Sequence, residues 1–187
     1  IKEYLDHLNI KRLELDEYEA DDIVGSMAKI SNLNDLHAIC VSGDKDLLQL
    51  TNTNIDVYLT KKGVSELEEY NIENFKEKMG FEVSQMVDYK ALIGDKSDNL
   101  EGVKGIGEKT AINLLAKYGT IDGIYEHIEE LTPKAKESFK EAHDICYQTR
   151  FLAKIYQDIA FDFTLNDLLY QQPNIHDLRL FFQKLEL

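Results

Sequence analysis

The segment "GVKGIGEKTAINLLAKYG", residues 102–119, places three glycines within six positions and then continues directly into strong helix formers. Glycine permits a tight turn, and a helix that starts at such a turn exposes its first backbone N–H groups. Exposed N–H groups at a helix N-terminus attract anions, phosphate above all. The segment therefore predicts a phosphate-binding turn, and the rest of the sequence has to indicate which phosphate is bound.

Composition limits the kind of phosphate site. Among the 187 residues, 35 Asp and Glu outnumber 21 Lys and Arg, and the formal net charge is −14. This balance argues against binding of nucleic acid through a broad basic surface. An acidic chain can still bind phosphate where its carboxylates surround metal ions and its positive charge is local.

Other features of the composition predict a cytoplasmic protein without a membrane partner. No apolar run approaches the ~20 residues that cross a bilayer, and the chain opens with an amphipathic helix pattern instead of a signal peptide. The two cysteines, Cys40 and Cys146, have apolar neighbours in the sequence. This favours buried thiols in a reducing compartment over a disulfide.

The first third of the chain alternates between strand and helix patterns. We expect strands at Ile10–Leu15, 37–43 and Ile55–Thr60, with helices at 18–31 and 44–50 between them. Such an alternation predicts an α/β fold with a parallel sheet covered by helices.

From Ser65 onward the pattern is almost wholly helical. Helices are expected in the stretches 64–80, 83–94, 108–119, 121–128 and 133–156, followed by an extended segment and a closing helix at 175–185. We therefore place an α/β core with a metal-binding crevice at residues 1–64. A mostly helical subdomain follows at 65–187, and its C-terminal segment is expected to pack back on the core.

Seven acidic residues lie in three clusters where one predicted element gives way to the next. They are Glu19, Asp21, Asp22, Asp44, Asp46, Asp95 and Asp98. Ligands of an open parallel sheet bind outside the carboxyl ends of its strands, so the first two clusters should face one crevice. Their mutual repulsion requires cations, and oxygen ligands without His or Cys suit Mg²⁺ or Mn²⁺ better than zinc. Two such ions about 4 Å apart would favour hydrolysis of a phosphodiester.

Simpler roles compete with these interpretations. Acidic residues at a helix start are commonly caps or partners of the helix dipole, and both Glu19–Asp22 and Asp44 allow that role. The five histidines are scattered without the spacing of metal ligands. The lysines near the glycine turn allow the role of plain solvated side chains; they are Lys90, Lys96, Lys104, Lys109 and Lys117.

Four segments together resemble a known family. "YEADDIVGSMAK" (18–29), "VSGDKDLLQL" (41–50), "ALIGDKSDN" (91–99) and the glycine segment resemble, in order and spacing, signature segments of the 5′-nuclease domain of bacterial DNA polymerase I, a flap-endonuclease-type domain. The resemblance implies a parallel-sheet PIN/flap-endonuclease-like core. It also implies that Glu19, Asp21 and Asp22 bind one Mg²⁺ (or Mn²⁺) and that Asp44, Asp46, Asp95 and Asp98 bind a second.

For the glycine segment, the resemblance implies a helix–three-turn–helix (helix–hairpin–helix) element at about residues 90–119. This element would grip the backbone of duplex DNA, with a bound K⁺. The implied DNA-binding residues are Gly102, Val103, Gly105, Ile106, Gly107, Lys109 and Thr110. Residues 89–119 hold five lysines against four acids, so without Asp95 and Asp98 this stretch carries a local net charge of +3.

The family's domain begins with a buried strand and a cationic helical arch, and neither precedes Ile1 here. The chain therefore resembles the C-terminal two-thirds of the domain. The expected function is Mg²⁺-dependent 5′-3′ exonuclease or flap endonuclease activity in repair and primer removal, weak or absent in this chain alone. We expect a monomer, near the bacterial nucleoid, whose partners are DNA with a 5′ flap or 5′ end and the missing N-terminal portion or a polymerase domain. A non-catalytic duplex-binding module is the alternative; a PIN-type ribonuclease is disfavoured by the hairpin.

Overall fold

A small mixed sheet forms the first half of the molecule. The computed structural model describes residues 1–63 and 65–186, so Val64, at our predicted domain boundary, and the terminal Leu187 lie outside the described residues. The strands are β1 (Ala38–Ser42), β2 (Ile55–Thr60) and β3 (Leu67–Tyr70), in the order β1-β2-β3. β1 and β2 are parallel, as predicted, and β3 is antiparallel to β2. The predicted α/β class is confirmed.

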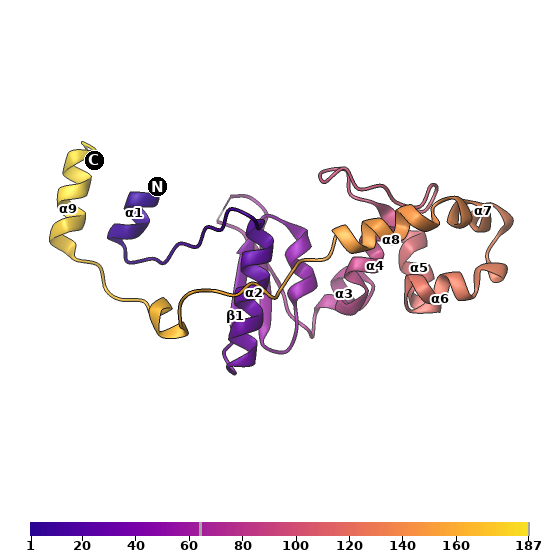
Figure 1. Cartoon of the computed structure of the whole chain (residues 1–187), viewed down its shortest axis with the longest axis horizontal. Coiled ribbons are helices and arrows are strands. Elements are labelled where there is room, and N and C mark those ends of the chain that lie inside the picture. Colours follow the sequence, from indigo (N-terminus) through magenta and orange to yellow (C-terminus); the bar gives the residue numbers. More distant parts are fainter. Residues whose placement is uncertain (64, 187) are drawn as a thin grey trace.

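Two helices pack on this sheet, α2 (Ala20–Leu33) and the 3-10 helix η1 (Lys45–Leu50). The first helix, α1 (Lys2–His7), lies away from the sheet (Figure 1). β2 turns Ile55, Val57 and Leu59 inward, where they meet the buried Leu47 and Leu48 of η1. The predictions of a helix at 18–31 and a short helix after the second strand are confirmed, although the latter is a 3-10 helix.

Two predictions for this half are wrong. Residues 10–15 form no strand in the described structure; Ile10 and Leu15 are exposed, and alternation alone does not make a strand without a partner strand. Residues 64–80 do not form one helix. Leu67–Tyr70 pairs with β2 instead, since sheet hydrogen bonds and the burial of Tyr70 outweigh helix propensity there. The sheet therefore continues past the predicted boundary.

The second half is helical, with its own core. Its elements are α3 (Phe75–Met79), η2 (Val83–Gln85), α4 (Met86–Ile93), α5 (Glu108–Tyr118), α6 (Ile121–Glu126), η3 (Ile128–Glu130), α7 (Pro133–Glu141) and α8 (His143–Leu152). Leu92, Leu115, Phe139 and Cys146 meet in this core. Cys40 and Cys146 are both buried and free, as predicted.

The single long helix predicted at 133–156 is wrong. It is two helices, α7 and α8, which meet at Ala142, where φ is −93° and ψ is 7°. The break at Ala142 lets both Phe139 and Cys146 reach the helical core. α8 is held by Arg150, whose guanidinium contacts the buried Asp88 of α4 at 2.7 Å and Asp122 of α6 at 2.8 Å.

The C-terminal segment packs on the core only in part. The chain crosses α2 after α8: the Tyr156 N–H donates to Asp22 at 2.8 Å and the Ile159 N–H to Ser26 Oγ at 3.2 Å. After η4 (Leu165–Leu168), α9 (Ile175–Lys184) packs against α1 instead, with Phe181 against Tyr4. Figure 1 shows α1 and α9 side by side, away from the sheet. Within the described residues, every helix is too short or too polar to span a bilayer.

Candidate metal centre and DNA-binding hairpin

Three separate elements bring acidic side chains to one cleft. Asp21 and Asp22 lie in the first turn of α2, directly after Glu19, while Asp44 and Asp46 follow the carboxyl end of β1. Asp95 and Asp98 lie in the loop that follows α4. A cleft of about 420 Å³ is lined by six of these seven residues: Glu19, Asp21, Asp22, Asp44, Asp46 and Asp98. Their role as metal ligands stays a prediction.

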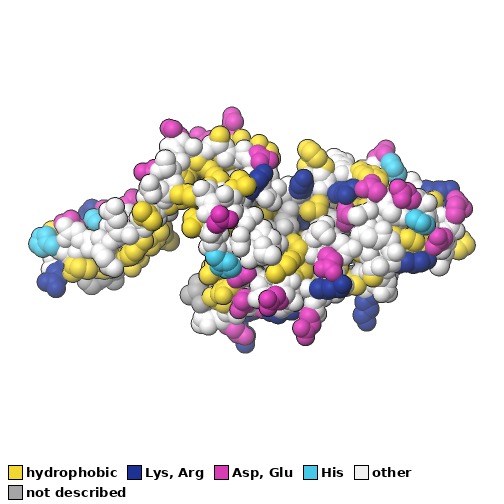
Figure 2. All heavy atoms as spheres, turned by 90° about the horizontal axis from the view of Figure 1, so that it is seen from below, with side chains coloured by type: hydrophobic (Ala, Val, Ile, Leu, Met, Phe, Trp, Pro, Cys, Tyr) yellow, Lys and Arg dark blue, Asp and Glu magenta, His cyan; other side chains and the backbone are white. Residues whose placement is uncertain are grey.

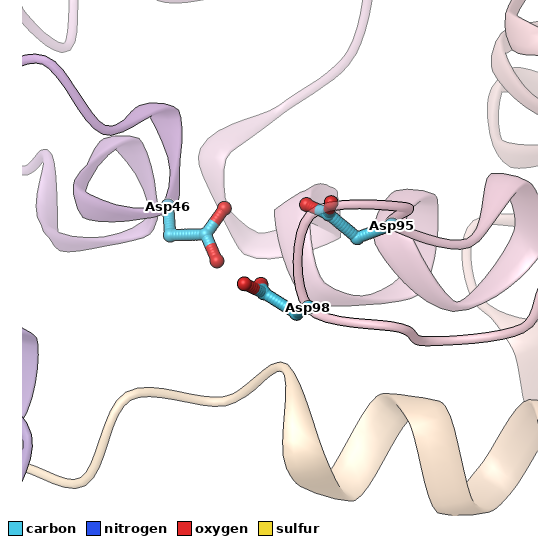
Figure 3. Close-up of side chains that lie close together, drawn as sticks. All are labelled: Asp46, Asp95 and Asp98. Atoms are coloured by element: carbon cyan, nitrogen blue, oxygen red, sulfur yellow. The ribbon is translucent and has the colours of Figure 1, made fainter.

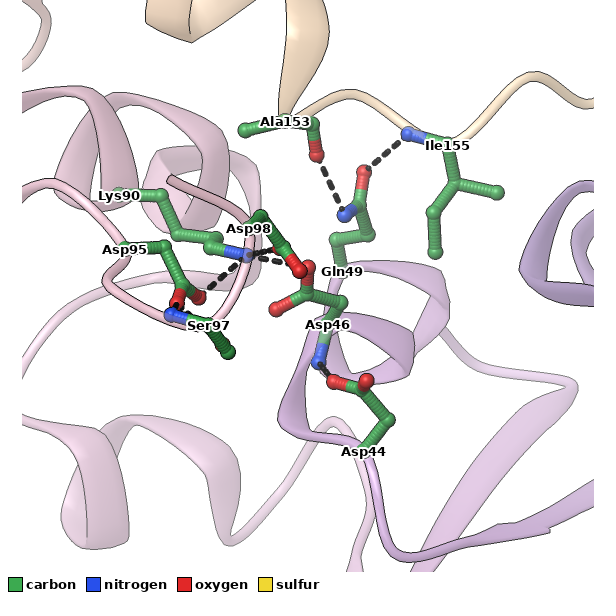
Figure 4. A network of polar contacts seen from close by, with 9 residues as sticks. All are labelled: Asp44, Asp46, Gln49, Lys90, Asp95, Ser97, Asp98, Ala153 and Ile155. Atoms are coloured by element: carbon green, nitrogen blue, oxygen red, sulfur yellow. Dashed lines mark hydrogen bonds and ion pairs between the residues drawn. The ribbon is translucent and has the colours of Figure 1, made fainter. Parts of the chain in front are cut away.

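The seventh residue, Asp95, is linked to Asp46 and Asp98 by contacts with one lysine, Lys90. Asp46, Asp95 and Asp98 point toward one another (Figure 3), and each offers one oxygen within 4.8 Å of the others. The Lys90 ammonium reaches into this group from α4 (Figure 4). It bonds Asp46 and lies 3.0 Å from Asp95 Oδ2 and 3.5 Å from Asp98 Oδ2.

Lys90 is the residue that sequence reasoning missed. The interpretation of Lys90 as a plain solvated lysine is wrong, because the residue is only 4% exposed. A signal was present in the sequence: Lys90 stands in the apolar run "YKALI", five residues before Asp95, and its neighbours Ala91 and Leu92 are fully buried. A lysine inside a buried helix needs an anionic partner.

The pKa shifts record how crowded the carboxylates are. Burial, together with Asp44 and Asp46, raises the pKa of Asp21. Burial also raises the pKa of Asp46, and Asp44 and Asp98 add to this effect against the opposing pull of Lys90. Burial alone would raise the pKa of Asp95 too, but hydrogen bonds from Ser97 and Lys90 lower it to about 2. Hydrogen bonds thus favour the ionised form of Asp95, whereas burial and neighbouring carboxylates disfavour ionisation of Asp21 and Asp46.

Hydrogen bonds decide between capping and cleft roles for the first two clusters. Asp44 Oδ1 accepts the Asp46 N–H at 2.9 Å, so Asp44 caps η1 and also lines the cleft. Glu19 occupies the N-cap position of α2 but makes no side-chain cap hydrogen bond. Asp22 accepts a backbone N–H from Tyr156, which ties the C-terminal segment to the cleft. Helix capping thus explains the presence of Asp44 only in part, and it does not explain the presence of Glu19.

The far wall of the cleft comes from residues that the sequence analysis did not include. Gln49 of η1 bridges the segment after α8: its Nε2 donates to the Ala153 carbonyl and its Oε1 accepts the Ile155 N–H, both at 3.0 Å (Figure 4). This bridge holds Lys154 in the cleft wall. More than 100 residues separate Gln49 from this segment, so no local pattern could have revealed the contact.

The glycine segment forms a tight hairpin between α4 and α5. A Cβ on Gly102 would lie 2.4 Å from the Gly94 nitrogen, so this close backbone approach requires glycine. The Val103 N–H donates to the Leu92 carbonyl at 2.9 Å. Val103 and Ile106 are buried in the helical core, and the Ile106 N–H donates to the Val103 carbonyl at 3.0 Å, so their side chains hold the hairpin together instead of facing a ligand.

The N-terminus of α5 is exposed and has no side-chain cap. Gly107 is its N-cap, with extended backbone at φ −101°, and Gly105 takes a positive φ of 81°. Gly107, Lys109 and Thr110 are all exposed. Among the described residues, none accepts a hydrogen bond from the first N–H groups of α5, so these groups could bind an anion; that role stays a prediction. A K⁺ ion at this hairpin stays a prediction.

The positive charge near the hairpin is smaller than the lysine count implied. Lys90 is buried, and the Lys117 ammonium bonds Glu130 at 2.9 Å. Among the described residues, Lys96, Lys104 and Lys109 make no ion pair. Acidic and basic side chains are interspersed on the face drawn in Figure 2, as expected for a chain without a broad basic surface.

Replacing Asp21 by Asn should stabilise the metal-free protein. The pKa of Asp21 is raised, so its ionised form costs stability above that pKa, and the cost disappears as the pH falls through it. At pH 7 the melting temperature should rise by about 2–4 °C for each kcal/mol relieved. Thermal unfolding from pH 7 to pH 3, with the exposed Asp162→Asn as control, measures this. An equal gain in both variants, or a gain that persists in acid, would contradict the crowding of Asp21.

Comparison with known sequences identifies both halves of the chain. Residues 1–80 match the family profile described as 5'-3' exonuclease, N-terminal resolvase-like domain, and residues 81–176 match 5'-3' exonuclease, C-terminal SAM fold. The chain is 41% identical to DNA polymerase I of Streptococcus pneumoniae over 99% of its length, which is 21% of that protein. It is 42% identical to a 5'-3' exonuclease of Mycoplasma pneumoniae over 87% of the chain and 56% of that protein.

Solved structures agree on the fold. A structure of T5 5'-exonuclease with bound divalent metal ions (zinc) has a TM-score of 0.66 at 23% identity, covering 77% of this chain and 52% of that one. The catalytic core of Rad2 in complex with DNA substrate has the same TM-score at 19% identity, covering 98% of this chain and 62% of that one. The sequence matches over both halves, together with this fold, establish that the chain belongs to the 5'-3' exonuclease family.

Proposed function

We propose that this chain supplies the catalytic cleft and the duplex-binding hairpin of a 5′ nuclease that hydrolyses DNA phosphodiesters at a 5′ end or a 5′ flap. The observation that carries the proposal is the convergence of carboxylates from α2, the β1–η1 junction and the α4–α5 loop on one cleft. The chain spans about a fifth of the polymerase relatives that it matches, so the activity of the whole protein is part of the proposal.

The donor set fits Mg²⁺ or Mn²⁺. Asp46, Asp95 and Asp98 provide three oxygens within 4.8 Å of one another, and the other cleft residues are also carboxylates. Hard divalent cations prefer such ligands. We assign one ion to Glu19, Asp21 and Asp22, and a second to Asp44, Asp46, Asp95 and Asp98. Two ions held there would activate water and stabilise the leaving oxygen of a phosphodiester.

The α4–α5 loop links the cleft to the hairpin. Asp95 and Asp98 occupy its first half, and Gly102 to Gly107 occupy its second half. A duplex gripped by the N–H groups at the start of α5 would bring its backbone along this loop toward the cleft. The relatives support this choice of substrate, since Rad2 was solved with a DNA substrate and the polymerase relatives act on DNA by name. We further propose a monomer in the bacterial cytoplasm, near the nucleoid, that works beside a polymerase domain.

A non-catalytic duplex-binding module remains the second candidate. It is favoured by one observation: an ammonium group already neutralises part of the second cluster. Both candidates predict duplex binding, and only the first predicts cleavage that depends on a divalent ion.

A 5′-labelled flap duplex with Mg²⁺ tests the nuclease directly. The chain should be assayed alone and also extended by whatever residues precede it in its reading frame. We expect metal-dependent release of the flap in the extended form, and a rate near background for the chain alone. Asp44→Asn with Asp98→Asn should abolish cleavage, because two ligands are lost while Asn still caps η1.

The control for the cleavage assay is Asp35→Asn with Asp162→Asn, which removes the same charge at exposed positions and should cut normally. Cleavage that persists in the Asp44 and Asp98 variant would contradict the assignment of the cleft. No cleavage by either form, with duplex binding intact, would favour the non-catalytic module.

Two variants of the hairpin separate backbone contacts from charge contacts. Gly107→Val should fold, since the space around Gly107 is open, but should weaken duplex binding roughly fivefold, or about 1 kcal/mol, by crowding the N–H groups of α5. Lys109→Met should weaken binding and also lower the salt dependence by about one counterion. Lys140→Met in α7 is the control. Titrations at several salt concentrations that leave Gly107→Val unchanged would remove the hairpin assignment.

A further inference from the structure

The Lys90 ammonium lies between the carboxylates of Asp46, Asp95 and Asp98, where their negative charge requires a cation. Its ammonium lies within 3.5 Å of oxygens from Asp46, Asp95 and Asp98, and these are the three residues whose oxygens could together hold an ion. The lysine stem rises from the most buried stretch of α4, beside Ala91 and Leu92. The packing of α4 therefore fixes the position of the ammonium, which would not be so for a lysine on a mobile surface side chain.

The oxygens of Asp95 show that little room is left for both cations. Its Oδ1 accepts from the Ser97 backbone N–H at 2.8 Å and from the Ser97 hydroxyl, while its Oδ2 faces Lys90 at 3.0 Å. Asp46 Oδ2 likewise accepts a hydrogen bond from the Lys90 ammonium. An ion that binds Asp95 therefore shares its oxygens with Ser97 or Lys90, and an ion placed beside the ammonium is repelled by its positive charge.

We propose that Lys90 is an internal counter-cation of the Asp46–Asp95–Asp98 cluster. In the metal-free chain its ammonium holds the three carboxylates at the spacing that an ion requires, and a divalent ion binds by displacing it. Lys90 is thus a positioning residue that keeps the site assembled and sets its affinity for metal. The inference rests on the proposed function only in that this cluster is taken to be a metal site.

Two consequences follow from the charges. Without the ammonium, three carboxylates of like charge stand together in a partly buried site, and this destabilises the metal-free fold. A divalent ion would then meet three uncompensated negative charges and no competing cation, so it should bind more tightly. Loss of metal-free stability and gain of metal affinity should therefore appear in the same variant.

Lys90→Met tests this, because Met keeps an unbranched apolar stem and removes the charge. With Mn²⁺ as the probe, calorimetric titration of the 187-residue chain should show a dissociation constant about tenfold lower than in the unmodified chain. The metal-free melting temperature should fall, and saturating Mn²⁺ should restore it. The control is Lys136→Met in α7, which removes a lysine paired with Glu129 of η3 and should leave Mn²⁺ affinity unchanged.

Unchanged or weaker Mn²⁺ binding by Lys90→Met would overturn the proposal, because the lysine would then not compete with the ion. A failure of the metal site itself would look different: the unmodified chain and Asp98→Asn would bind Mn²⁺ equally or not at all. Should Lys90→Met not fold, the unmodified chain provides a second measurement. The nitrogen-15 signal of the Lys90 ammonium should move or vanish on saturation with Mg²⁺, and a signal that stays unchanged would overturn the proposal.

Discussion

Repulsion between carboxylates is the constraint on which the rest of this structure depends. Six acidic side chains line one cleft, and a seventh, Asp95, lies beside Asp46 and Asp98; such a gathering is unfavourable unless cations compensate it. Part of the compensation is internal, from the Lys90 ammonium. In the proposed function, divalent ions from solution compensate the remainder. The cleft therefore destabilises the folded state, and the two hydrophobic cores have to offset this cost.

The two cores are joined across the cleft by few but specific contacts. The sheet core and the helical core meet where Lys90 of α4 contacts Asp46 of η1, and where Gln49 holds the segment after α8. Asp22 fixes the same segment from the other side. Charged and polar groups of the cleft thus add to the apolar link between the halves, in which Phe75, Phe81 and Met86 pack into the sheet core. Occupation of the cleft by ions would change how firmly the halves are joined.

Local patterns in the sequence predicted those helices and strands whose formation depends on neighbouring residues in the chain. The apolar strands at 38–42 and 55–60, helix α2 and the glycine start of α5 were all recognisable, as were the acidic clusters. The wrong predictions concern segments whose conformation is determined by contacts with distant parts of the chain. Leu67–Tyr70 becomes a strand only because β2 lies beside it, and Ala142 breaks a helix to bury both Phe139 and Cys146. Lys90 was missed because its helix face is set by tertiary packing.

A site for divalent ions, as proposed for these carboxylates, should be directly visible by X-ray diffraction. The most direct measurement is the anomalous scattering of Mn²⁺ in crystals of the chain. We expect a peak about 2.0–2.6 Å from oxygens of Asp46, Asp95 and Asp98, with the Lys90 ammonium moved away from it, and a weaker peak beside Glu19, Asp21 and Asp22. Saturating Mn²⁺ that leaves the cleft without a peak, with Lys90 still bonded to Asp46, would contradict it.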